Sequence, residues 1–236
     1  MNAQPCPPLD EHPLDRVIWG ALTSSHAPLA QGDGPARRYP ALIGPLAGLR
    51  DRSPASYAAL AALVPPGDAV GLLDLEPIEP PPPFTVLQRD RVDQMLLTGP
   101  LPPIPAMDLV PLGPADMPAM MALTALTHPG PFKHGTHELG SFLGMRLDGQ
   151  LIAMTGERMR LPGFTEVSAV CVHPGHRGRG YAAALVAAVA GAIVGRDEVP
   201  FLHVRSDNEG AIALYLKLGF QWRRTFHFAV LGCAEA

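Results

Sequence analysis

The stretch that most constrains the fold is Val170-Cys-Val-His-Pro-Gly-His-Arg-Gly-Arg-Gly-Tyr-Ala182. An apolar strand is predicted to end at His173-Pro174, and a glycine-containing turn then leads into a helix near Tyr181. Glycines let the backbone approach a ligand closely, and the unpaired N–H groups of a first helical turn attract anions, as does the helix dipole. The stretch therefore predicts an anion site that a pyrophosphate fits.

The other features of this turn narrow the class of phosphate site. Arg177 and Arg179 add positive charge beside the expected amide groups, although either side chain has simple solvation as its alternative role. No Gly-Lys-Ser/Thr follows, which excludes a Walker loop, and the Gly-x-Gly-x-x-Gly fingerprint of dinucleotide-binding folds is absent. The turn therefore belongs to a different kind of phosphate site.

The elements around the turn predict a mixed sheet with helices on its faces. Asp148-Gly149 between two apolar runs is a strong hairpin signal, and methionines and leucines at helical spacing indicate an amphipathic helix before it. The order is α, β-hairpin, β, α, β, α, β, which predicts an α/β (α+β mixed sheet) fold. The expected ranges are 114–127 (helix), 142–147 and 151–159 (hairpin), 165–172 (strand), 181–194 (helix), 201–205 (strand), 209–218 (helix) and 225–231 (strand).

The first hundred residues predict a separate, smaller α/β unit. The proline cluster at 100–105 precedes a change of pattern and places a domain boundary near residue 105, which divides the chain into 1–105 and 106–236. Ser53-Pro54 predicts the start of a helix over 55–64, and strands are expected at 69–75 and 84–97. This unit shows no recognisable chemistry.

A second motif makes the function of the larger unit specific. The segment Asn208-Glu-Gly-Ala-Ile-Ala-Leu-Tyr215-Leu-Lys-Leu-Gly-Phe220 resembles the Asn-x-x-Ala-x-x-Leu-Tyr-x-x-Leu-Gly-Phe stretch of the GNAT superfamily of N-acetyltransferases. The segment Arg177-x-x-Gly180-x-Ala182 resembles the family's Gln/Arg-x-x-Gly-x-Gly/Ala pattern, which holds the pyrophosphate of acetyl-CoA. The resemblance covers roughly residues 107–231.

The resemblance implies a GNAT acyl-CoA N-acyltransferase fold that binds acetyl-CoA as cosubstrate. Backbone groups of a splayed strand are expected to contact the pantetheine arm, and Asn208 to hydrogen-bond it, with helix capping as its alternative role. Tyr215 is expected to protonate the departing thiolate, with a core tyrosine as the alternative. The implied cofactor-binding residues are Val170, Cys171, Val172, Arg177, Gly178, Arg179, Gly180, Tyr181, Ala182, Ala183 and Asn208.

Two residues are candidates for the general base, and the sequence does not choose between them. Glu166 lies eleven residues before Arg177, the spacing of the base glutamate in histone-acetylating members. His203 lies five residues before Asn208, where ribosomal-protein-acetylating members place a glutamate, and an imidazole titrates near neutral pH. Each has a structural alternative, a strand-edge charge for Glu166 and a hydrogen-bonded core histidine for His203.

Composition limits partners, compartment and metal chemistry. The net charge of −4 without a basic stripe argues against nucleic acid, and no apolar run is long enough to span a membrane. Three cysteines (Cys6, Cys171, Cys233) and the absence of a leader-like N-terminus predict a cytoplasmic protein without a disulfide framework. Cys171 is expected to be a buried strand residue rather than a nucleophile. Neither Cys171-x-His173-x-x-His176 nor His134-x-x-His137 has the second ligand pair of a closed zinc site, so no metal is predicted.

These observations favour direct acetyl transfer from acetyl-CoA to a primary amine, with a small metabolite as the first choice of acceptor. A protein N-terminal or lysine acetyltransferase is the alternative on the same fold, and a non-catalytic acyl-CoA-binding regulatory module is the alternative of another class. The 1–105 unit is interpreted as a degenerate GNAT-like half that could cover the acceptor site. The oligomeric state is left open, with a homodimer as one alternative.

Overall fold

The computed structural model of the chain describes residues 12–233. Within this range the α-helices are α1 (Val17–Thr23), α2 (Pro54–Leu63), α3 (Met117–Thr127), α4 (Tyr181–Val194) and α5 (Glu209–Lys217). The strands are β1 (Ala36–Arg38), β2 (Ala47–Leu49), β3 (Ala69–Asp74), β4 (Phe84–Leu97), β5 (Val110–Leu112), β6 (Phe142–Leu147), β7 (Gln150–Leu161), β8 (Phe164–Val172), β9 (Val199–Arg205) and β10 (Phe220–Cys233).

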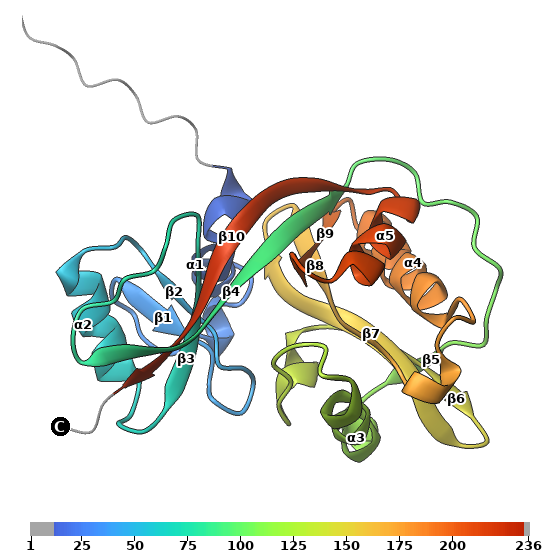
Figure 1. The fold of residues 1–236 in the computed structure, drawn as a ribbon, viewed down its shortest axis with the longest axis horizontal. Coiled ribbons are helices and arrows are strands. Elements are labelled where there is room, and N and C mark those ends of the chain that lie inside the picture. The colour runs from blue at the N-terminus through green and yellow to red at the C-terminus, as the bar shows by residue number, and fades with distance from the viewer. Residues whose placement is uncertain (1–11, 234–236) are drawn as a thin grey trace, which may run out of the picture.

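One large mixed sheet organises the molecule. Its strand order is β3-β10-β4-β9-β8-β7-β6-β5, and β1 and β2 form a separate two-stranded sheet. Neighbouring strands of the large sheet run antiparallel except β8 and β9, which are parallel. Helices α4 and α5 cover one face on the C-terminal side, and α3 covers the other (Figure 1). The predicted α/β mixed-sheet class is confirmed.

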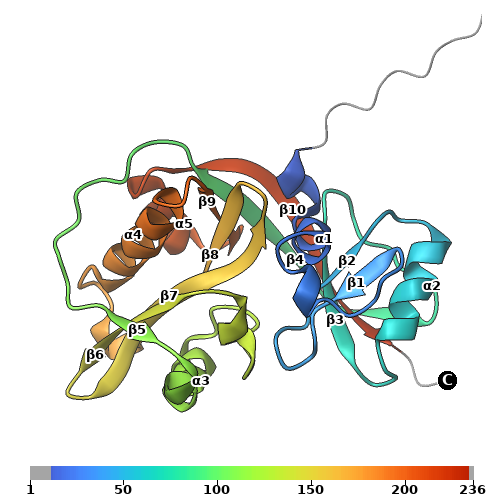
Figure 2. The ribbon, with the colours of Figure 1, turned by 180° about the vertical axis from the view of Figure 1, so that it is seen from behind.

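The first and last parts of the chain share their two longest strands. β4 and β10 pair antiparallel along their whole length, from Phe84 opposite Cys233 to Leu97 opposite Phe220. β4 lies between β10 and β9, and β10 lies between β4 and β3. Both views show this pair running between the two halves of the molecule (Figures 1 and 2). The division at residue 105 stays a prediction, and the sheet is continuous across it.

The two halves repeat one pattern of elements around this pair. In the second half, the parallel strands β8 and β9 flank α4 in the chain. In the first half, β2 and β3 flank α2, and an isolated parallel bridge joins Leu46, next to β2, to Gly71 of β3. β9 then pairs with residues 92–96 of β4, and β3 pairs with residues 227–232 of β10. The halves are therefore related by an approximate local twofold axis through the β4–β10 pair.

Most of the predicted elements lie where the sequence placed them. The hairpin turn at Asp148-Gly149 has φ values of 50° and 79°, the left-handed backbone that this dipeptide favours. Ser53 caps α2 by accepting a hydrogen bond from the amide of Ser56, as predicted. β10 is longer than the predicted strand 225–231, because its ladder with β4 continues from Phe220 to Cys233. The short elements before residue 50 were not predicted.

The proline-rich segment between β4 and β5 lies along the outside of α4 (Figure 1). A Cβ atom at Gly191 would lie 3.7 Å from Leu101, and one at Gly180 would lie 3.6 Å from Met107. The segment therefore follows α4 back to its N-terminal end, where the predicted anion site lies.

Candidate active site

A wedge-shaped opening between β8 and β9 marks the candidate site. The two strands pair only at Phe164–Val199, Thr165–Pro200 and Glu166–Phe201. Beyond Glu166, the edge of β8 that faces β9 has no strand partner, and its backbone groups are available to a ligand. Val170, Cys171 and Val172 lie in this part of β8, and their contact with a pantetheine arm stays a prediction.

A β-bulge interrupts β8 just beyond the apex of the opening. Cys171 pairs with Met154 and Ser168 with Gly156, so two residues of β8 oppose Thr155 of β7. Ala169, within the bulge, has a φ of 53°. The Thr155 hydroxyl donates a 2.8 Å hydrogen bond to the Ser168 carbonyl and so satisfies a group that the bulge frees. Nothing in the sequence indicated this bulge, since alanine is not a residue that favours positive φ.

The glycine turn lies between the end of β8 and α4. Gly178 and Gly180 have φ values of 76° and 80°, a backbone that other residues adopt only with strain. The amide groups of residues 178–183 have no acceptor among the described residues, and the first cap bond of α4 is from Ala184 to Gly180. Arg177 and Arg179 are exposed beside them. The anion site predicted from the sequence falls on this row of free amides and cations, and binding of a pyrophosphate there stays a prediction.

Tyr215 and Asn208 come from α5, on the α4 side of the sheet. Tyr215 packs with Leu202 and Val204 of β9, and burial raises the pKa of its phenol to about 12. Its hydroxyl has no hydrogen-bond partner in the part of the chain that the structure describes. Asn208 caps α5 by accepting a 3.2 Å hydrogen bond from the amide of Ala211, so its structural role is realised.

The two candidate bases are bonded to each other on the opposite face of the sheet. His203 Nδ1 lies 2.7 Å from Glu166 Oε1. Arg158 binds the same carboxylate with one edge of its guanidinium, through two hydrogen bonds of 2.7 Å, from Nε to Oε2 and from Nη2 to Oε1. Burial alone would raise the pKa of Glu166, but the charge and hydrogen bonds of Arg158 outweigh it and, with His203, lower the pKa to about 2.

The network continues into the first half of the chain. Gln94 on β4 lies with its Nε2 3.0 Å from His203 Nε2 and donates to the Leu14 carbonyl at 3.2 Å. The Gln94 carbonyl oxygen accepts from Arg223 at 2.9 Å, and Arg223 pairs with Asp15 at 2.6 Å. Because Arg223 and Leu14 fix which end of Gln94 is the amide, Gln94 donates to His203 Nε2 and His203 donates from Nδ1 to Glu166.

This arrangement occupies both candidate bases. Glu166 accepts two hydrogen bonds on each oxygen, the fourth coming from the amide of Met159 at 3.3 Å. His203 uses its Nδ1 proton on Glu166 and its Nε2 lone pair on Gln94. A base role for either residue stays a prediction, and it requires one of these hydrogen bonds to open. Gln94 and Arg223 were not predicted, because nothing in the sequence links strands that lie more than 100 residues apart. Arg158 was not predicted either, although it lies only eight residues before Glu166, on the neighbouring strand.

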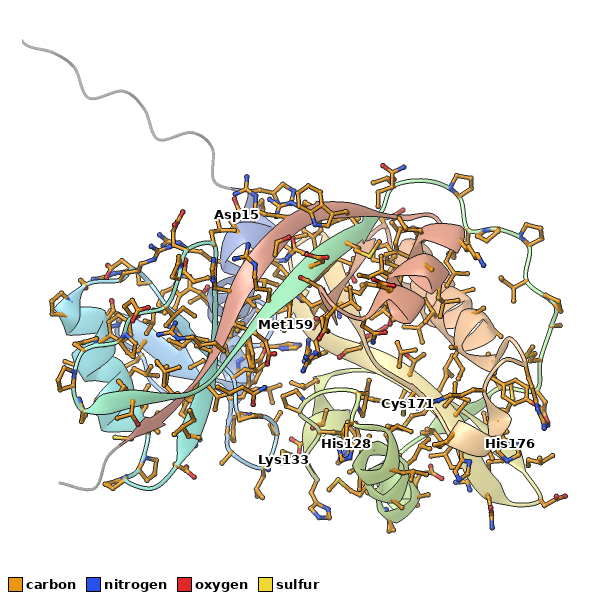
Figure 3. All side chains as sticks on the ribbon, in the orientation of Figure 1. Asp15, His128, Lys133, Met159, Cys171 and His176 are labelled. Carbon is orange, nitrogen blue, oxygen red and sulfur yellow. The ribbon has the colours of Figure 1, made fainter. Side chains whose placement is uncertain are left out.

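The remaining candidates have structural surroundings. Cys171 is buried and points toward α3 (Figure 3), and burial raises the pKa of its thiol to about 11. Cys233 is also a buried free thiol, and Cys6 lies outside the described residues. Within residues 12–233 no group of three His, Cys, Asp or Glu side chains is arranged to hold a metal ion. No described helix is long and apolar enough to cross a membrane.

We expect Glu166→Gln to lower the free energy of unfolding by about 3–5 kcal/mol at pH 7, because Arg158 loses its buried counter-charge. The pKa of Glu166 is lowered from 4.5 to about 2 in the folded chain, so its contribution is complete above pH 4.5 and declines as the pH falls toward 2. The difference between wild type and variant in urea unfolding should therefore narrow below pH 4.5.

The matched control is Glu79→Gln, because Glu79 also pairs with one arginine, through Nη2 of Arg89, but is 75% exposed. The loss of unfolding free energy in Glu79→Gln should stay below about 1 kcal/mol, both at pH 7 and below pH 4.5. Equal costs for the two variants would contradict the buried network.

Comparisons with known proteins agree with this geometry. The family model described as FR47-like protein matches residues 142–229. A putative acetyltransferase from the GNAT family, from Novosphingobium aromaticivorans, has a solved structure with a TM-score of 0.89 and 41% identity, over 95% of this chain and all of that one. The tandem GNAT protein from the clavulanic acid biosynthesis pathway shares the fold, with a TM-score of 0.52 and 17% identity over 81% of this chain and 76% of that one.

A curated relative, the N-alpha-acetyltransferase RimI of Mycobacterium tuberculosis, is 37% identical over 83 residues. The match covers 34% of this chain and about half, 51%, of that protein. The resemblance and the fold that the sequence predicted are confirmed by the full-length structural match. The chain therefore belongs to the GNAT family of N-acetyltransferases.

Proposed function

We propose that the chain transfers an acetyl group from acetyl-CoA directly to a primary amine on a small metabolite. The observation that carries this proposal is the row of free amides at 178–183, placed at the wide end of the opening between β8 and β9. Pyrophosphate on these amides would direct the pantetheine arm along the free edge of β8 toward the bulge. The thioester would then lie near the apex.

The chemistry needs a neutral amine and a proton for the thiolate. The amine nitrogen attacks the thioester carbonyl carbon, the C–S bond breaks, and the thiolate takes a proton, which we assign to the Tyr215 hydroxyl. The nitrogen gives up one proton as the amide forms, and that proton, passed through water, restores the Tyr215 phenol. Because burial raises the pKa of Tyr215 to about 12, the phenol stays protonated across the neutral and mildly alkaline range. The buried thiol of Cys171 has no part in this direct transfer.

The covered acceptor face favours a small acceptor. The face of β8 and β9 that carries Glu166 and His203 packs against α1 and the turn before it, through Leu14, Ile18 and Phe201. This packing leaves less room for a folded protein terminus than for a small amine. N-terminal acetylation of a protein is the second candidate function, and the partial match to RimI favours it.

We interpret the first half, over residues 12–105, as a degenerate copy in which the position of the anion is already occupied. Its equivalent turn places the Asp51 carboxylate on the amide of Ser53 and the hydroxyl of Ser56, at 3.0 and 2.6 Å. A side-chain anion thus takes the position of a phosphate at the start of α2. A Cβ atom at Gly48 would lie 2.5 Å from the backbone of Trp19, so α1 packs directly against one face of β2.

We expect Gly180→Trp to abolish the stabilisation by acetyl-CoA, measured as the shift in melting temperature, because the side chain would disturb the amide row. Gly163→Trp is the matched control, since Gly163 has a similar φ of 81° in the turn between β7 and β8. The control should lose stability but keep its acetyl-CoA shift. A shift that survives in Gly180→Trp would refute this placement of the pyrophosphate.

The variant Tyr215→Phe tests whether the chain catalyses acetyl transfer. With isotopically labelled acetyl-CoA and a panel of amines, we expect the variant to transfer label about 10²- to 10⁴-fold more slowly, the usual contribution of a general acid, with unchanged acetyl-CoA binding. Binding of acetyl-CoA without transfer to any amine, in both wild type and variant, would instead favour the regulatory module.

A further inference from the structure

We propose that Arg158 binds an anionic group on the acceptor, so that the acceptor is an amine that also carries a carboxylate or a phosphate. This inference rests on the proposed acetyl transfer and names the substrate class of the same site. It assigns Glu166, His203 and Gln94 as positioning residues, whose hydrogen bonds hold the guanidinium of Arg158 in one orientation.

The guanidinium of Arg158 is fixed along one edge and open along the other. Glu166 takes Nε and Nη2, each at 2.7 Å, in a fork. The third nitrogen, Nη1, has no acceptor among the described residues and is not shut off from solvent, and the side chain is 17% exposed. An arginine has five donors in a rigid plane, so it can hold one carboxylate with one edge and present the other edge to a second anion.

The position of Arg158 matches the place where an acceptor must enter. Its partner Glu166 is the last residue of β8 that pairs with β9, so the guanidinium lies at the apex of the opening. The bulge at Ala169 follows three residues later on the same strand. Met159, its neighbour in the chain, lies between the two halves at the centre of the molecule (Figure 3). An anion held here would place an attached amine within a few bonds of the thioester.

The network behind Arg158 explains why so many polar groups are buried. Glu166 and Gln94 are fully buried and His203 nearly so, although apolar side chains at these positions would serve stability as well. Each carboxylate of the network is matched by an arginine, Asp15 by Arg223 and Glu166 by Arg158. The network therefore brings no excess negative charge toward an incoming anion, and it holds one donor group in a fixed direction.

The test compares amines in matched pairs that differ in the anionic group. The full chain would be given labelled acetyl-CoA with glycine or glycinamide, β-alanine or its amide, and phosphoethanolamine or ethanolamine. We expect kcat/KM to favour the anionic member of at least one pair by about 10- to 100-fold, the effect of a charge-assisted hydrogen bond. Arg158→Lys should remove that preference mainly by raising KM, because lysine cannot bind both anions.

Arg160→Lys is the matched control, since Arg160 lies two residues further along β7 and pairs with Glu198 away from the opening. It should keep the preference. Binding can also be measured without turnover, with N-acetylglycine as the product of glycine acetylation. Together with coenzyme A, it should raise the melting temperature of wild type and Arg160→Lys, and not that of Arg158→Lys.

The outcomes separate the two proposals. Transfer to amines without preference for an anionic member, or a preference that survives in Arg158→Lys, would overturn the role of Arg158 and leave acetyl transfer standing. An absence of transfer to every amine, together with no N-acetylglycine effect on wild type, would overturn both. Gln94→Leu should raise KM for the anionic amine with little change in kcat, and an equal loss for the neutral member would show a merely structural role.

Discussion

The pairing of β4 with β10 is the constraint on which the rest of the structure depends. These two strands are the longest of the large sheet together with β7, and every ladder bond between the halves passes through them. β4 supplies the neighbour that β9 needs, and β10 supplies the neighbour that β3 needs. Each half therefore supplies a strand that pairs with a strand of the other half.

The shape of the candidate site depends on this pairing of β4 and β10 with strands of the other half. With β9 held on one side by β4, its separation from β8 beyond Phe201 leaves an opening on the other side only. β4 also places Gln94 beside His203, and β10 places Arg223 beside Gln94. A chain of hydrogen bonds thus reaches from Asp15 to Arg158. Residues 12–105 contribute to the candidate site through this network and through the packing of α1 against the same face of the sheet.

Local signals in the sequence were enough to predict the glycine turn before α4 and most elements. Glycines that need positive φ, a capping residue such as Ser53 and the Asp-Gly turn act within a few residues, so their effect can be read directly. The bounds of β4 and α4 were predicted for the same reason, because proline, glycine and apolar runs mark them. Two family motifs then supplied the function that the physics of an anion site alone left open.

The parts that escaped prediction are contacts between distant residues. β4 was expected in a separate unit, and nothing in its sequence shows that it inserts beside β9. Gln94 and His203 are 109 residues apart, and their hydrogen bond depends on that insertion. Glu166 and His203 were identified as alternatives, whereas the fold joins them in one pair. The bulge at Ala169 reflects the ladder between β7 and β8, not the residue itself.

The most direct test of this account is the cooperative unfolding of residues 106–236 expressed alone, compared with the same fragment mixed with residues 1–105. Because the fragment lacks β4, it should show no cooperative transition by circular dichroism in urea, and addition of the first fragment should restore one. A fragment that unfolds cooperatively alone, with the stability of the full chain, would contradict the claim that the two halves build one sheet and one site.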